Sequence, residues 1–91
     1  MITGKTKSGF EFELNDHVHE DYEVIEALVK FFRRTSYDNF VAFTEQMFKG
    51  AEDCEKRARD FLRERDGFVS TEAMQELVFD IWNASKELKN S

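Results

Sequence analysis

The stretch ITGKTKSGFEFEL, residues 2–14, contains the clear strand pattern of this chain. Phe10, Phe12 and Leu14 alternate with two glutamates, a period of two that places apolar side chains on one face of a strand. Gly9 suits a tight turn because glycine accepts a positive φ angle, so residues 2–14 are predicted to form a β-hairpin. The expected register follows from the pairing of like faces: Ile2 with Leu14, Gly4 with Phe12, Thr6 with Phe10 and, on the outer face, Lys5 with Glu11.

The rest of the chain has helical periodicity, and a short hairpin needs such helices against its apolar face. Ser36 is a good N-cap, and Gly50 and Gly67 are typical of helix C-termini. The predicted fold is α+β and mostly α, a single domain over residues 1–91. In it, the hairpin of residues 1–14 packs on amphipathic helices at 21–33, 37–49, 51–65 and 71–87.

Each predicted helix has an apolar stripe that is expected to face the core. In the helix over residues 21–33 this stripe consists of Tyr22, Ile25, Leu28, Val29 and Phe32. The hairpin is expected to cover the helices as a lid, and its outer edge is a place where a partner strand could add.

Four apolar residues do not fit these stripes. Val24 and Phe31 form a second flank of the first helix, Phe48 lies at the edge of the second, and Phe79 projects among polar residues of the last. We interpret the set as a partner-binding surface or a self-assembly interface. The alternative is that the hairpin or a neighbouring helix covers them.

Composition bounds the function. The net charge of −6 and the lack of a basic third argue against nucleic-acid binding, although an acidic DNA mimic remains an option. A single cysteine, Cys54, fits a reducing compartment. No signal-peptide pattern and no apolar run of membrane-spanning length is seen, so we expect a cytoplasmic protein without membrane contact.

Candidate chemical sites are few, and we expect neither an enzyme nor a cofactor. The loop 64–70 resembles half of an EF-hand, but positions 62 and 73 lack the required carboxylates, so helix capping explains it better. His17 and His19 have no third metal ligand patterned nearby and are interpreted as surface residues of a connector. Cys54 is expected to be a buried thiol.

Both ends of the chain resemble the small tail assembly chaperones of siphophages and prophages of Gram-positive bacteria. The resemblance is carried by residues 2–13, by Asp21 and Tyr22 at the start of an acidic helix, and by the segments 66–74, 80–81 and 89–91. The segment 35–49 departs from the family pattern because it has phenylalanines and no proline.

This resemblance implies a non-enzymatic protein of the bacterial host cytoplasm that takes part in virion morphogenesis and is absent from the mature virion. Its partners would be the tape measure protein and the major tail protein, the subunit of the tail tube, and it could form a homo-oligomer. Two other interpretations stay open: a small acidic prophage-encoded adaptor or inhibitor of a host protein, and an ion-binding helix–loop–helix module.

Overall fold

The N-terminal segment forms the expected antiparallel hairpin. The computed structural model, which describes residues 1–89, places strand β1 at Ile2–Lys5 and strand β2 at Glu11–Leu14. Gly9 has a φ of 95° in the turn between them. The predicted register is confirmed, with these partners: Ile2 and Leu14, Thr3 and Glu13, Gly4 and Phe12, Lys5 and Glu11.

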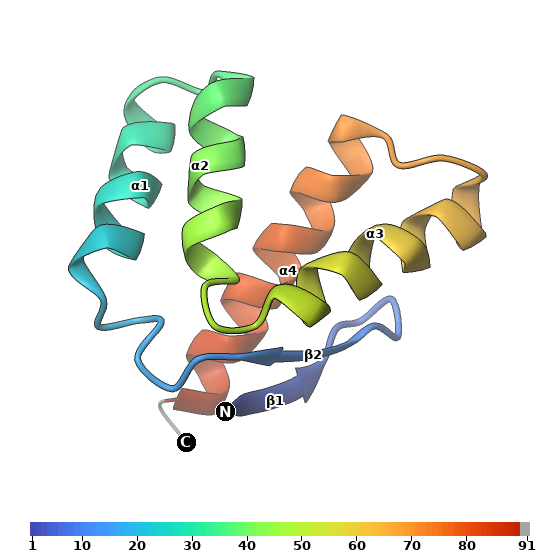
Figure 1. Cartoon of the computed structure of the whole chain (residues 1–91), viewed down its shortest axis with the longest axis horizontal. Helices are drawn as coiled ribbons and strands as arrows, with labels where there is room; N and C mark the ends of the chain where they lie inside the picture. The colour runs from blue at the N-terminus through green and yellow to red at the C-terminus, as the bar shows by residue number, and fades with distance from the viewer. Residues whose placement is uncertain (90–91) are drawn as a thin grey trace.

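Helices make up most of the remaining chain, which confirms the α+β, mostly α class. They are α1 (Tyr22–Arg33), α2 (Tyr37–Met47), α3 (Glu52–Asp66) and α4 (Thr71–Lys89). In Figure 1, α1 and α2 stand side by side, α3 and α4 diverge from them, and the hairpin lies across the base. Residues 90–91, part of the resemblance above, lie outside the described residues.

Local capping sets most helix ends. The Asp21 carboxylate accepts a hydrogen bond from the Glu23 amide at 2.9 Å, and the Ser36 hydroxyl accepts one from the Asn39 amide at 3.2 Å. Gly67, at φ 87°, closes α3 in the left-handed conformation. α2 ends two residues earlier than expected, at Met47, since the chain turns before Gly50.

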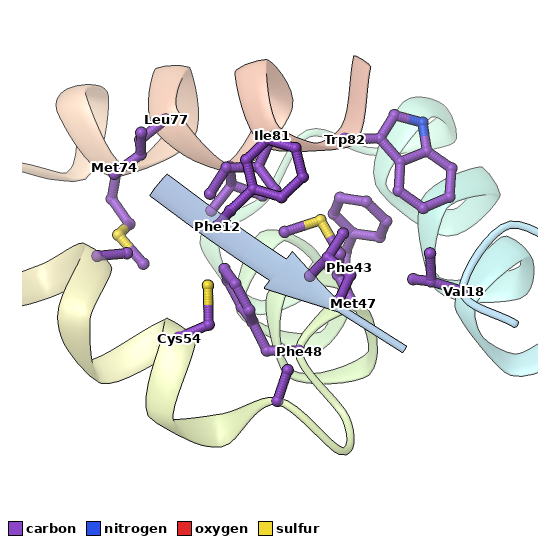
Figure 2. Packing of buried hydrophobic residues seen from close by; sticks show 14 of the residues in the cluster. Phe12, Val18, Phe43, Met47, Phe48, Cys54, Met74, Leu77, Ile81 and Trp82 are labelled. Carbon is purple, nitrogen blue, oxygen red and sulfur yellow. The ribbon is translucent and has the colours of Figure 1, made fainter. Parts of the chain in front are cut away.

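The core surrounds β2. Figure 2 shows side chains of α2, α3 and α4 directed toward this strand from several sides. Every helix and the hairpin contribute buried apolar residues, among them Phe12, Leu14, Val24, Phe43, Met47, Phe48, Cys54, Leu62, Val78 and Ile81. The hairpin is therefore an integral part of the core, not only its lid.

The outer edge of β2 is covered by α3. The Glu13 amide donates to Sγ of Cys54 at 3.5 Å, and Nη1 of Arg57 donates to the Glu11 carbonyl at 3.0 Å. These two backbone groups point away from β1, because hydrogen-bonded and outward-facing positions alternate along an antiparallel strand. The expectation of an edge open to a partner strand is therefore wrong for β2.

A candidate interaction surface on the first helix

The four residues predicted to bind a partner belong to the core. Val24 and Phe48 are each 1% exposed, Phe31 is buried, and Phe79 is half-buried against the core cluster. The prediction that these side chains form an accessible surface is therefore wrong. Of the two interpretations, cover by neighbouring helices is the correct one.

Phe79 shows how this cover arises. Its ring stacks on Phe43 and Phe31, with centroid distances of 5.4 and 5.6 Å, and lies 6.5 Å from the Phe40 ring. The α1–α2 pair packs on the side of α4 that carries Phe79. The polar residues on that side of α4 gave no sign of this second contact.

The predicted core stripe of α1 faces outward instead. Tyr22 is 76% exposed and Phe32 is 64% exposed, while Ile25 and Val29 lie near one-third exposure. Leu28 is half-buried at the margin of the stripe. The expectation that these five residues face the core is therefore wrong for Tyr22, Ile25 and Val29, while Leu28 is half-buried and the mostly exposed Phe32 ring still lies 6.2 Å from the Phe79 ring.

The opposite flank of α1 is buried because it packs on α2, and Phe31 near its end also reaches Phe79 of α4. Val24, Ala27 and Phe31 follow one another at helical spacing, and all three are buried. Ala27 lines a small pocket between α1 and α2, opposite Ala42. Apolar residues thus cover about half of the α1 circumference, more than the core accommodates.

We call Tyr22, Ile25, Val29 and Phe32 the α1 apolar face. These residues are separated by three, four and three positions, the spacing of a helix–helix seam. Glu26 directly follows Ile25, and Arg33 directly follows Phe32, so both charges lie along one flank of the face. The sequence signal for this surface is the excess width of the apolar region, which no single core contact can bury.

The start of α1 carries a defined electrostatic contact. Nζ of Lys49 lies 3.1 Å from the Asp21 carboxylate and 3.7 Å from that of Glu23. The hydrogen bond from Lys49 lowers the pKa of Asp21 below its ordinary value, and the amide of Glu23 adds to this effect. The same bond to Asp21 raises the pKa of Lys49.

Cys54 is buried, as expected, and is poorly suited to nucleophilic chemistry. Its side chain has no exposed surface, and burial raises the pKa of its thiol. A protonated thiol is a weak nucleophile and a weak metal ligand. The hydrogen bond that it accepts from the Glu13 amide gives it a structural role at the edge of β2.

The two histidines lie on different sides of the connector before α1. His17 is exposed, whereas the His19 ring lies 4.2 Å from the Trp82 ring, and its Nε2 lies 2.8 Å from the Ser85 hydroxyl. Ser85 is fully buried and donates to the Trp82 carbonyl at 2.8 Å. It therefore accepts from His19, and the pair is a packing contact and not a nucleophile with its base. His19 is thus more buried than expected for a surface histidine.

Among residues 1–89, no group of three or more His, Cys, Asp or Glu side chains is arranged to hold a metal ion. In the loop 64–70, Gly67 ends α3, and the Ser70 hydroxyl accepts a hydrogen bond from the Ala73 amide at 3.0 Å. Capping therefore accounts for the residues that resemble an EF-hand. Within the same described range, no helix has the length and apolarity that crossing a bilayer would need.

Comparison with known proteins gives no relative. No protein family, curated protein or solved structure matches this chain. The α1 apolar face is thus the feature of the described residues on which a function can be argued.

Proposed function

We propose that this chain is a tail assembly chaperone of a siphophage or prophage, a non-enzymatic protein that binds the tape measure protein and tail tube subunits in the host cytoplasm. It acts during virion morphogenesis and leaves before the virion is mature. The observation that carries the proposal is the α1 apolar face, where large apolar side chains are exposed, Tyr22 and Phe32 most of all. The Phe32 ring also lies 6.2 Å from the Phe79 ring, so the face continues the core outward. The resemblance of both chain ends to this family supplies the identity of the client.

The chemistry of the face suits a helical client. Tyr22 and Phe32 are aromatic anchors at the two ends of α1, and Ile25 and Val29 fill the space between them. Aromatic residues dominate the energetics of protein interfaces because they bury a large area at low entropic cost. A tape measure protein with long amphipathic helices would find here a stripe of matching periodicity.

The acidic character of the chain supports the same function. A net charge of −6 keeps the protein, and an apolar client bound to it, in solution. A chaperone of this kind shields apolar helices until the tail tube subunits assemble around them.

The test is capture of fragments of the tape measure protein encoded near this gene by the purified chain. We expect the wild type to retain fragments rich in amphipathic helix, and Val29→Asp to lose at least tenfold in retention. The matched control is Val41→Asp on α2, which makes the same change at a side chain that is 51% exposed outside the α1 apolar face. Its retention should equal that of the wild type.

Two results would contradict the proposal. Retention of no tape measure fragment by the wild type would remove the client, and equal losses in the two aspartate variants would remove the α1 apolar face as its site. The order of genes gives an independent check, since a tail tube gene upstream and a very long tape measure gene downstream are expected.

The second candidate, a small acidic adaptor or inhibitor of a host protein, is favoured by the negative charge alone. Binding of that kind would rest on exposed carboxylates and fall steeply with salt. Binding through the α1 apolar face would instead be insensitive to salt and sensitive to Val29→Asp. Measuring the affinity for a partner at low and at high ionic strength therefore distinguishes the two candidates.

A further inference from the structure

We infer that the α1 apolar face pairs with the α1 apolar face of a second copy of this chain, with the two helices antiparallel about a two-fold axis. The inference goes beyond the proposed function and does not depend on the identity of the client. It rests on three properties of α1: the spacing of its exposed apolar residues, the order of its charges and its length.

The spacing favours another helix as the occupant. Tyr22, Ile25, Val29 and Phe32 repeat at three, four and three residues, which is the a and d pattern of two helices that pack side by side. A flat strand or an irregular loop would not match a stripe that follows one side of a helix for three turns.

The charges favour an antiparallel copy of the same helix. Glu26, in the first half of α1, and Arg33, at its end, are both exposed on the same flank of the face. Neither forms an ion pair within the described residues. Because a two-fold contact uses the same patch on both copies, reversing the second helix brings the acid of each copy toward the base of the other.

A specific register satisfies the apolar and the charged residues together. If the two-fold axis passes between Leu28 and Val29, Ile25 of each copy lies level with Phe32 of the other. Glu26 is then two residues out of level with Arg33 of the second copy, about 3 Å along the axis at 1.5 Å per residue. Side chains of this length span such an offset, so both cross-copy ion pairs can form.

The size of the face makes this a weak dimer. A helix of twelve residues is about 18 Å long, and one face of it buries well below the roughly 800 Å² per partner of a stable interface. The copies are therefore expected to associate at high concentration and separate on dilution. A client helix would compete for the same side chains, so dimer and client complex exclude each other.

Cysteine cross-linking of the full chain tests the register. In the antiparallel pair, Val29→Cys lies close to the axis and should form a disulfide with its own copy under a mild oxidant. Ile25→Cys and Phe32→Cys should stay unlinked when each is alone, because their copies are about 10 Å apart along the axis, beyond the reach of a disulfide. A mixture of the two should link. The wild type is the control, since its Cys54 is fully buried.

Light scattering over a concentration series provides the second measurement. The wild type and Val41→Asp should rise from the mass of one chain toward that of two, and Val29→Asp should remain at one. The inference is overturned if the wild type stays monomeric at every concentration, if Val29→Asp still dimerises, or if Ile25→Cys links to itself as in a parallel pair. Failure to capture tape measure fragments would leave this dimer standing, and a monomeric wild type would leave client capture standing.

Discussion

The ring of Phe79 on α4 stacks on the ring of Phe43 on α2, with centroids 5.4 Å apart and planes inclined by only 16°. This contact joins the α1–α2 pair to the last helix. Phe31 and Phe40 surround the same ring, so Phe79 fills the space where three helices meet. It explains why an aromatic residue stands on the side of α4 that also carries Glu72, Glu76 and Asn83.

Phe79→Ala should therefore behave as a core truncation. We expect the free energy of unfolding to fall by about 3 kcal/mol, because the lost ring leaves a cavity among the surrounding phenylalanines. Urea denaturation at 25 °C measures this loss. Phe68→Ala is the control at a side chain that is 63% exposed, and it should cost less than about 1 kcal/mol. Equal losses in the two variants would show that Phe79 is not a core residue.

Gly4→Ala should destabilise the hairpin where α4 crosses it. A β-carbon at Gly4 would lie 2.7 Å from Cζ of Phe12 and 2.6 Å from Cδ1 of Leu88. Leu88 can move aside, but the buried Phe12 ring cannot, so we expect a net loss of about 1–2 kcal/mol in the free energy of unfolding. Thermal unfolding of Gly4→Ala with and without Leu88→Ala separates the two clashes. A loss that disappears in the double variant would assign the cost to Leu88 and contradict the expected role of Phe12.

The contact between Asp21 and Lys49 should make stability depend on pH in the acidic range. The pKa of Asp21 is lowered in the folded protein, so its contribution is complete above the unfolded pKa, near 4, and is lost as pH falls through the folded value. Asp21→Asn keeps a capping oxygen but lacks the charge. We expect it to have a lower Tm than the wild type at pH 7 and the same Tm near pH 2.

Lys49→Gln removes the other partner of this contact. It should also have a lower Tm than the wild type at pH 7 and the same Tm near pH 2. In its background, Asp21→Asn should change the pH dependence less than it does in the wild type, because only the backbone amides then lower the pKa of Asp21. A difference in Tm between wild type and Asp21→Asn that persists unchanged at pH 2 would show that the charge of Asp21 is not its cause.

The Cys54 thiol should be unreactive in the folded state. Its side chain is fully buried, and burial raises its pKa, so iodoacetamide meets neither an accessible sulfur nor a thiolate. Intact-mass spectrometry should show no adduct in buffer at pH 7.5 and one adduct in concentrated urea. Tyr22→Cys, at the most exposed position of the α1 apolar face, should gain one adduct in buffer alone. Rapid labelling of the wild type in buffer would mean that α3 opens from β2.

The hairpin was predictable because buried apolar residues alternate with more exposed glutamates along β2. A shift of one residue would turn Phe10, Phe12 and Leu14 to solvent, so the pattern determines the register. The helix ends were predictable for a similar reason. Ser36 caps the start of α2 and Gly67 ends α3, and both effects act within a few residues. These features depend on local geometry, which the sequence contains.

The orientation of α1 was not predictable in the same way. Its apolar residues cover about half of the helix. Periodicity alone therefore predicts burial of Ile25 and Val29 as readily as burial of Val24 and Phe31. The choice depends on the shape of the α2 and α4 surfaces, which receive Val24, Ala27 and Phe31. Phe79 was misassigned for the same reason, because periodicity within α4 does not reveal that a second layer of helices covers its polar side. The candidate surface was therefore located only once the packing was known.

The contact of α3 with the outer edge of β2 also determines when that edge is covered during synthesis of the chain. Cys54 and Arg57 follow their hydrogen-bonding partners in β2 by 41 and 46 residues, respectively. A ribosome therefore releases the hairpin well before the side chains that complete its outer edge. During this interval the outer edge of β2 has no partner, so the nascent chain is open to pairing with the strand of another molecule.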